Sequence, residues 1–144
     1  MQNTAWELER ILDETRPRLL AFDEPAAGKR SADEKWSRKE ILGHLIDSAA
    51  NNHQRFVRLQ IERTLSLPGY RQPDWVRVQH YQDRLWSDLV ELWTAYNRHL
   101  AHIMRHADPQ AGSHLWKSPD GDVPLAFLMT DYLKHLRHHL DQIL

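Results

Sequence analysis

The clearest helix start in the chain is the segment WSRKEILGHL, residues 36–45. Ser37 is followed three positions later by Glu40, the spacing of a capping box, in which two side chains satisfy backbone N–H groups that a helix start leaves free. Apolar residues then recur at helical period along the following sequence. The segment therefore predicts a helix that begins at Ser37, carries His44 in its second turn and ends near Leu65.

Three further segments show the same apolar repeat, and linkers that contain proline and glycine separate them. They are Thr4–Phe22, a segment that starts between Gln82 and Asp88 and runs to Asp108–Pro109, and Pro124–Leu144. Pro17 can kink the first of them, because proline donates no backbone hydrogen bond. Either Asp83 or Ser87 can cap the start of the next, and Pro124 suits a first helical position.

The linkers on either side of the third helical segment are each longer than a dozen residues, and loops of that length are often functional. Asp120-Gly121 suggests a tight turn, so residues 116–123 can form a small hairpin. No internal repeat or second domain is evident. We expect an all-α fold, a single four-helix bundle domain over residues 1–144 with long inter-helix loops.

Composition excludes several classes of function. The chain has 19 Lys and Arg against 20 Asp and Glu, so its net charge of -1 gives no general attraction for nucleic acid. No apolar run reaches the ~20 residues that span a bilayer, and the first nine residues lack the pattern of a signal peptide. The absence of cysteine fits a reducing compartment and excludes thiolate catalysis by the protein itself. We expect a cytoplasmic protein with no membrane partner.

The ten histidines differ in their position relative to the apolar stripes of the predicted helices. His44 lies on one flank of its stripe, and His135 and His139, four positions apart, share one flank of the last. His102 and His106 have the same spacing but point away from the stripe of the third helical segment. Two ordinary half-buried histidines remain the alternative to a metal site, and convergence of all three imidazoles requires the two helix edges to face each other.

Four polar residues on the helix stripes or their flanks are candidates for a substrate pocket: Ser48, Asn52, Arg55 and Asn97. The two asparagines can instead form helix-to-helix hydrogen bonds. Arg55 can hold a substrate carboxylate in a forked geometry or pair with a glutamate, and Ser48 can simply permit close packing. Glu40 and Asp131 each precede a candidate ligand by one turn, and neither receives a catalytic role.

Two stretches, WSRKEILGHL at residues 36–45 and YLKHLRHHLDQI at residues 132–143, resemble the DinB/YfiT-like superfamily. The resemblance implies a four-helix bundle of up-down-down-up order, frequent dimerisation and a divalent metal ion, zinc or nickel, held by His44, His135 and His139. Characterised members include transferases that use low-molecular-weight thiols such as bacillithiol or mycothiol, and a thiol-dependent isomerase.

The leading hypothesis is therefore a divalent-metal-dependent enzyme with a small-molecule substrate and a three-histidine site open to it. A thiol-dependent S-transferase is the narrower version and a metal-assisted hydrolase the broader one. The alternative is a metal-free ligand-binding or dimeric interaction module without catalysis. Six tryptophans and four tyrosines are many for this length, so we expect a homodimer in which some of Trp75, Trp86 and Trp116 cover the partner.

Overall fold

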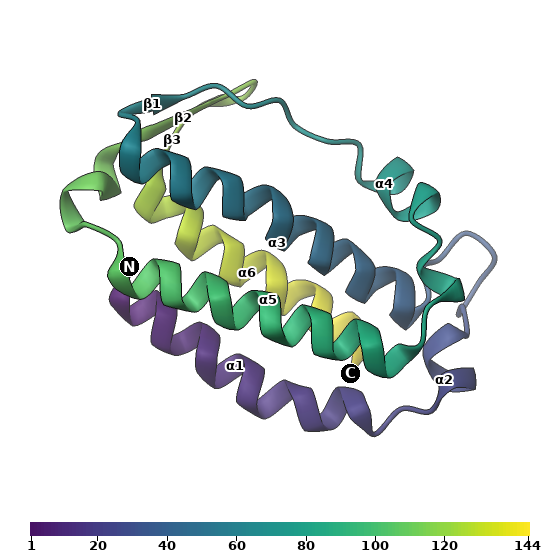
Figure 1. Cartoon of the computed structure of the whole chain (residues 1–144). Coiled ribbons are helices and arrows are strands. Elements are labelled where there is room, and N and C mark those ends of the chain that lie inside the picture. The colour runs from purple at the N-terminus through teal and green to yellow at the C-terminus, as the bar shows by residue number, and fades with distance from the viewer.

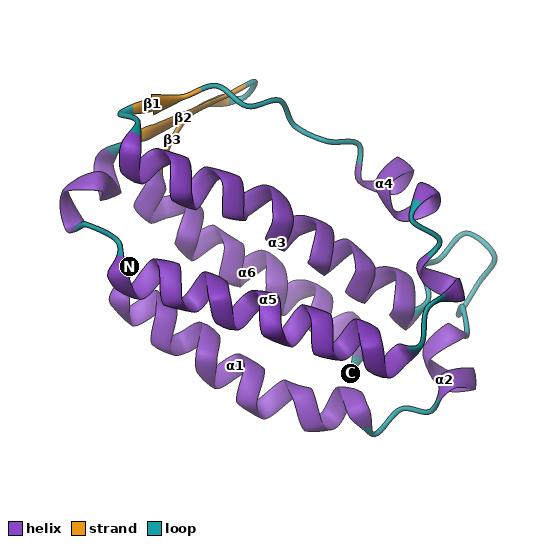
Figure 2. Cartoon of the chain, in the orientation of Figure 1, coloured by secondary structure: helices purple, strands orange, loops and turns teal.

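Four long helices lie side by side and make up most of the molecule (Figures 1 and 2). The computed structural model describes residues 1–144. Its elements, in chain order, are α1 (Gln2–Leu20), α2 (Glu24–Gly28), α3 (Arg38–Ile61), β1 (Thr64–Leu65), α4 (Gln72–Val78), the 3-10 turn η1 (Tyr81–Asp83), α5 (Trp86–His106), the 3-10 turn η2 (Pro109–Ser113), β2 (Leu115–Ser118), β3 (Gly121–Pro124) and α6 (Leu125–Ile143).

The order of the long helices is up-down-down-up, as expected from the family resemblance. Helices α1 and α6 run in one direction, and α3 and α5 run in the other (Figure 1). Helix α1 packs on α5, α5 on α3, and α3 on α6, and each long helix contributes apolar side chains to one buried core. The antiparallel contact between α3 and α6 is the one that brings the predicted histidines together.

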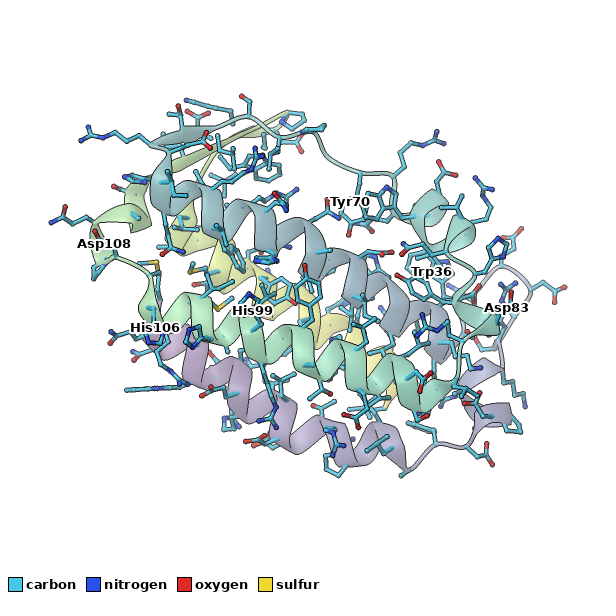
Figure 3. The ribbon with its side chains drawn as sticks, in the orientation of Figure 1. Trp36, Tyr70, Asp83, His99, His106 and Asp108 are labelled. Atoms are coloured by element: carbon cyan, nitrogen blue, oxygen red, sulfur yellow. The ribbon has the colours of Figure 1, made fainter.

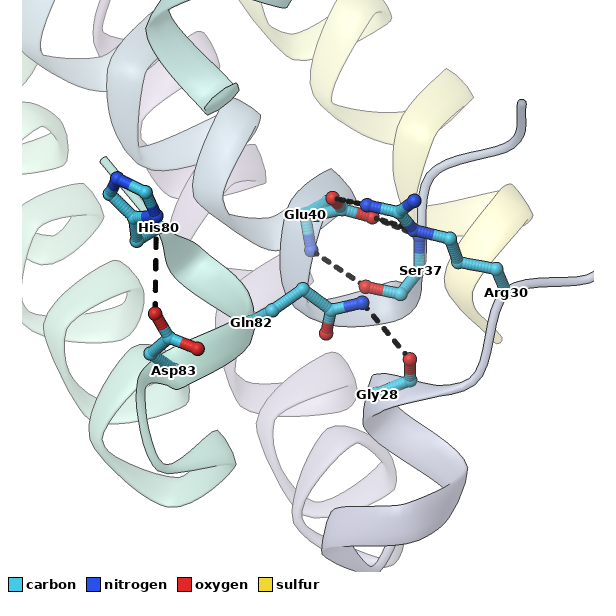
Figure 4. A network of polar contacts seen from close by, with 7 residues as sticks. All are labelled: Gly28, Arg30, Ser37, Glu40, His80, Gln82 and Asp83. Carbon is cyan, nitrogen blue, oxygen red and sulfur yellow. Dashed lines mark hydrogen bonds and ion pairs between the residues drawn. The ribbon is translucent and has the colours of Figure 1, made fainter. Parts of the chain in front are cut away.

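The start of α3 is held by its own sequence and by the loop before it. Ser37 and Glu40 form the predicted capping box in both directions. Glu40 also accepts hydrogen bonds from the guanidinium of Arg30, one of them 3.0 Å long from Nε (Figure 4). Its carboxylate is therefore fully engaged in fixing the helix start, which places Glu40 in a structural role.

A close approach between Gly43 and Tyr81 fixes η1, and with it the adjacent α4, on the outer side of α3. A Cβ atom on Gly43 would lie 2.1 Å from Cδ2 of Tyr81, so only glycine leaves room for the ring. The Tyr81 hydroxyl donates to Oδ1 of Asp47 at 2.7 Å, and the amide of Gln79 donates to the same oxygen at 2.6 Å. This contact anchors the linker that passes over the candidate site.

The structure settles three details of the helices that the sequence left open or placed differently. Helix α1 continues past Pro17 to Leu20. Helix α3 ends at Ile61, because Thr64 and Leu65 pair as β1 with β2 in parallel. Helix α5 begins at Trp86, within the predicted range, but neither Asp83 nor Ser87 caps it, since the carboxylate of Glu24 accepts the hydrogen bond of its first N–H group.

The hairpin predicted at residues 116–123 is present as β2 and β3, which pair antiparallel from Leu115–Pro124 to Ser118–Gly121. The order of the small sheet is β1-β2-β3. It lies beside the C-terminal end of α3, where β2 carries Trp116 (Figure 1). The linkers thus add a cover over one face of the bundle.

One of the three tryptophans proposed to cover a partner is part of the core instead. Trp86 is 2% exposed, and its Nε1 donates to the carbonyl of Leu19 at 2.7 Å. That expectation is therefore wrong for Trp86, whereas Trp75 is exposed and Trp116 is half-buried. None of the helices combines the length and the apolar character that crossing a membrane requires.

Candidate metal centre

Three imidazole rings from two helices meet at one point between α3 and α6. His44 Nε2 and His135 Nε2 lie 3.2 Å apart, and the ring centroids of His44 and His139 are 4.7 Å apart. One ring nitrogen from each of the three histidines lies within 4.8 Å of the others, and no other group of three or more His, Asp and Glu side chains is arranged in this way. The two helix edges therefore face each other, which is the condition that the sequence left open.

Helix geometry explains why these three rings converge. His135 and His139 are four positions apart, so they project from the same face of α6, with ring centroids separated by 4.6 Å. His44 projects from the second turn of α3 toward that face, where it is fully buried. The Trp36 ring lies 5.3 Å from the His44 ring and covers it from the preceding loop.

The spacing of the ring nitrogens fits a shared metal ion. Two imidazole nitrogens that bind one zinc ion at 2.0–2.1 Å with a tetrahedral angle are separated by about 3.3 Å. The 3.2 Å between His44 Nε2 and His135 Nε2 is close to this value. In addition, Nδ1 of His44 is buried without a hydrogen-bond partner. A hydrogen bond to the protein at Nδ1 therefore does not explain why this ring is buried.

The surroundings keep the three imidazoles neutral. Burial lowers the pKa of His44 to about 3, and the proximity of His139 and His135 lowers it further in the same direction. Burial likewise lowers the pKa of His135 to about 4, and it lowers the pKa of His139. At neutral pH each ring therefore has a free lone pair, as a metal ligand must.

A hydrogen bond from outside the cluster orients His139. Its Nδ1 lies 3.2 Å from Oε1 of Gln142, which can only accept, so the proton of the neutral ring is on Nδ1. The Nε2 lone pair is then available to the centre of the cluster. Contacts of this kind set the tautomer and the direction of a metal-binding histidine, and sequence reasoning did not assign this role to Gln142.

None of the remaining histidines shares the convergent nitrogen set, although the ring centroid of His138 lies 5.1 Å from that of His139. His138 is exposed. His102 and His106 are also exposed, as predicted from their face of α5, and their ring centroids lie 4.3 Å apart. His53 faces α5 from the other flank of α3, where its Nδ1 lies 3.0 Å from the Tyr96 hydroxyl. The ring centroid of His99, on α5, lies 5.1 Å from that of His53.

A pocket of about 300 Å³ adjoins the histidine cluster. Three of the four predicted pocket residues, Ser48, Asn52 and Arg55, line it together with His135. The other lining residues are Gly69, Tyr70, Gln72, Trp116, Leu128, Asp131 and Tyr132. Tyr70 lies on the linker that leads into α4, above α3 (Figure 3), and sequence reasoning missed it because nothing local relates a linker position to a helix face.

The prediction of Asn97 as a pocket residue is corrected by its burial. Asn97 is fully buried and does not line the pocket. Its Oδ1 accepts a hydrogen bond of 2.6 Å from the Tyr132 hydroxyl, and its Nδ2 donates to the carbonyl of Trp93 at 2.9 Å. The amide therefore joins α5 to α6, which is the alternative interpretation of this residue.

The comparisons with known proteins agree on one family. A model of the DinB superfamily matches residues 7–143. A protein of Bacillus mycoides (strain KBAB4), provisionally named a metal-dependent hydrolase, is 23% identical over 109 residues, which are 75% of this chain and 62% of the relative. The matched region thus spans less than two thirds of that relative.

Two solved structures share the fold. YfiT from Bacillus subtilis, described as a probable metal-dependent hydrolase with an unusual four-helix bundle topology, superposes with a TM-score of 0.82 at 19% identity, over 96% of this chain and 83% of YfiT. A mycothiol-dependent maleylpyruvate isomerase superposes with a TM-score of 0.77 at 15% identity, over 98% of this chain and 60% of the isomerase. Because the family model covers nearly the whole chain, from α1 to the end of α6, the protein belongs to the DinB superfamily.

Proposed function

We propose that His44, His135 and His139 bind one divalent metal ion, zinc or nickel, and that the protein is a metal-dependent enzyme acting on a small molecule. The observation that carries the proposal is the convergence of three neutral imidazoles beside a pocket. Three protein ligands leave a coordination position open for water or substrate. The names of the Bacillus relatives, which refer to metal-dependent hydrolases, support the same reading.

The protein surroundings suit two reaction types. A bound divalent cation lowers the pKa of a coordinated water or thiol and so supplies a nucleophile at neutral pH. The chain has no cysteine, so the thiol of an S-transfer reaction is a second, low-molecular-weight substrate. The fold similarity to a mycothiol-dependent enzyme supports this version, and the hydrolase names support attack by water.

Asp131 is the carboxylate best placed to accept a proton in this pocket. It lines the pocket one turn before His135 and makes no hydrogen bond or ion pair within the chain. Glu40 is unsuited to the role because Arg30 and the start of α3 occupy both of its oxygens. We assign Asp131 to proton transfer between substrate and solvent, which a general base performs by hydrogen-bond contact with the reacting group.

Elemental analysis of untagged protein tests the metal site. We expect about one divalent ion per chain in the wild type, loss of that ion in His135→Ala and His139→Ala, and retention in His102→Ala. The last variant is the matched control because His102 belongs to the other pair with i,i+4 spacing, which is exposed. Protein that stays metal-free after equilibration with zinc or nickel would indicate the alternative, a metal-free ligand-binding or interaction module.

A second assay separates the two reaction types once metal is bound. The loaded protein is incubated with an alkylating electrophile in the presence and absence of several cellular thiols, and in parallel with ester and amide substrates. Thiol-dependent conjugation supports the S-transferase, and thiol-independent product supports the hydrolase.

The homodimer remains part of the proposal, and sedimentation at low protein concentration measures it directly.

A further inference from the structure

Arg55 is a half-buried cation without a carboxylate partner. Its guanidinium carbon lies 3.9 Å from the centroid of the Trp116 ring, and its Nη1 donates to Oδ1 of Asn52 at 3.2 Å. No Asp or Glu side chain forms an ion pair with it, although many of the more exposed arginines have one, such as Arg98 with Asp13. The glutamate pairing considered for Arg55 from the sequence is therefore absent.

The contacts that Arg55 does make orient it without neutralising it. The ring of Trp116 supports one face of the guanidinium plane, a stacking arrangement that also stabilises the charge. Asn52 accepts one N–H group, and the remaining N–H groups of the fork have no acceptor in the chain. Burial lowers the pKa of Arg55, which reflects the cost of removing an unpaired charge from water. A ligand with a negative charge would relieve that cost.

Other donors surround the same space. Burial raises the pKa of Tyr70 to about 12, so at neutral pH its phenol keeps the proton, and its hydroxyl has no hydrogen-bond partner within the chain. Ser48 and Gln72 add a hydroxyl and an amide to the lining. The acidic residue of the lining, Asp131, forms no ion pair with Arg55 and belongs to α6 near His135. The pocket therefore has a fixed cation and neutral donors on the α3 side.

The distance along α3 relates this cation to the histidine cluster. His44, Ser48 and Arg55 lie on one flank of the helix, and the eleven residues from His44 to Arg55 correspond to roughly 16 Å of helix rise. Arg55 lines the pocket itself, and the cluster reaches it through His135, whose Nε2 lies 3.2 Å from that of His44. A pocket of about 300 Å³ is at the small end of the range for ligand sites, so it suits a short molecule with different groups at its two ends.

We infer that this pocket binds small organic acids, with a carboxylate held by the guanidinium of Arg55 and the reactive group directed to His44, His135 and His139. The inference rests on the proposed function only for the part of the substrate that faces the three histidines. The carboxylate site at Arg55 does not depend on it. A planar guanidinium with free N–H groups matches a carboxylate in a forked geometry, which selects carboxylates over neutral analogues of the same shape.

Binding of glutarate to the metal-free protein tests the carboxylate site. Tryptophan fluorescence and calorimetry follow the titration, because Trp116 stacks on Arg55 and should report an anion there. We expect saturable binding of glutarate and none of its neutral diamide, glutaramide. Replacement of one charged hydrogen-bonding partner should weaken binding about 10- to 100-fold in Arg55→Met, and Arg55→Lys should restore only part of the loss because it lacks the fork.

The matched control is Arg58→Met, since Arg58 is exposed on the same helix and lies outside the pocket; it should bind glutarate like the wild type. Circular dichroism verifies that each variant is folded. Equal affinity for glutarate and glutaramide in the wild type, no glutarate binding at all, or unchanged binding in a folded Arg55→Met would overturn the inference.

The same series separates this inference from the proposed function. The titrations use protein treated with a chelator, so the carboxylate site is measured whether or not zinc binds. If the protein bound no zinc but bound glutarate in an Arg55-dependent way, the proposed metal centre would be wrong and the carboxylate site would stand. If the protein bound zinc normally but bound glutarate independently of Arg55, the inferred carboxylate site would be wrong and the metal centre would stand.

Discussion

His44 and His135 are 91 positions apart in the chain, yet their Nε2 atoms lie 3.2 Å from each other across the contact between α3 and α6. The site is thus built from two helices that are already packed by a large apolar core. The core does not depend on the histidines for its apolar contacts. The rings are held in place by the fold rather than by a flexible loop, which makes the site available before any ligand arrives.

Metal removal should therefore leave the bundle folded. We expect chelator-treated protein to keep its far-ultraviolet circular dichroism. Zinc at about 100 times its Kd should add about 2.7 kcal/mol to the free energy of unfolding by mass action, or roughly 5–10 °C in Tm for a chain of this size. Thermal unfolding with and without zinc measures the shift, which His135→Ala should abolish. Loss of helicity on chelation would contradict this prediction.

Gln142 should contribute to metal affinity without binding the metal. It accepts the hydrogen bond from His139 Nδ1, and loss of such an orienting partner typically costs about 10- to 100-fold in affinity. We expect a reduction of this size in Gln142→Ala, measured by competition with a chromophoric chelator. Asp141→Ala is the control, because its neighbouring exposed side chain makes no hydrogen bond to the cluster. Equal affinities in the two variants would show that the contact has no orienting effect.

Acid should destabilise the metal-free protein. The histidine cluster should account for much of the dependence of the free energy of unfolding on pH. Unfolded histidine has a pKa near 6.5, whereas the folded pKa values of His44 and His135 are about 3 and about 4. Below pH 6.5 the unfolded chain therefore binds protons that the folded chain does not, so the free energy of unfolding falls as the pH decreases toward 4. Each such proton changes the stability by up to about 1.4 kcal/mol per pH unit.

Urea unfolding at pH 7.5, 6.5, 5.5 and 4.5 measures this dependence. The wild type should be nearly flat above pH 6.5 and lose stability below it. His44→Gln should have a shallower slope, whatever its absolute stability, and His102→Ala should keep the wild-type slope because that ring is exposed. Parallel slopes in the wild type and His44→Gln would mean that the buried imidazole takes no part in acid unfolding.

The parts of the structure that follow from local sequence could be predicted, and the parts that depend on linkers could not. The capping box at Ser37, the face of His44 and the shared flank of His135 and His139 are set by spacing within one helix. The start of α5 fell within the predicted range, but its cap was misassigned to Asp83 or Ser87, because its first N–H group is bound by Glu24, a residue of another helix. The pocket was predicted only in part, because Tyr70 and Trp116 reach it from linkers.

Arg55 and Asn97 show the limit of face analysis. Both lie on or beside an apolar stripe, and the sequence left open for each whether it meets a ligand or another residue. The ring of Trp116, from the hairpin, stacks on Arg55, and the guanidinium lines the pocket. The Oδ1 atom of Asn97 instead accepts a hydrogen bond from the Tyr132 hydroxyl. The partner in each case comes from a different element, so no pattern within one helix could have decided between the alternatives.

Gly43→Ala should destabilise the protein, although alanine is the better helix former. In a helix interior that exchange normally stabilises by about 1 kcal/mol. Here the new Cβ would lie 2.1 Å from the Tyr81 ring, and displacing the ring would break its hydrogen bond to Asp47. We expect a net loss of about 1–3 kcal/mol, as for other overpacked sites, measured by urea unfolding. Gly112→Ala, whose Cβ would meet Ala126 at an ordinary 3.5 Å, should change the stability far less.

The hydrogen bond between Tyr132 and Asn97 should be worth more than its counterpart between Tyr96 and His53. In Tyr132→Phe the Oδ1 of Asn97 would lose its donor in a fully buried place, and an unsatisfied buried acceptor costs about 1–3 kcal/mol. In Tyr96→Phe the partner ring of His53 is only half-buried, so water can replace the lost hydroxyl and the cost should stay below about 0.5 kcal/mol.

Urea unfolding of the two variants compares these costs directly, and both changes remove one hydroxyl from a tyrosine on a long helix. Because Asn97 joins α5 to α6 and does not line the pocket, Tyr132→Phe should lower stability while leaving the zinc affinity within about twofold of the wild type. If instead zinc affinity fell tenfold or more with little change in stability, the Tyr132 hydroxyl would be acting on the histidine site rather than on the packing of the two helices.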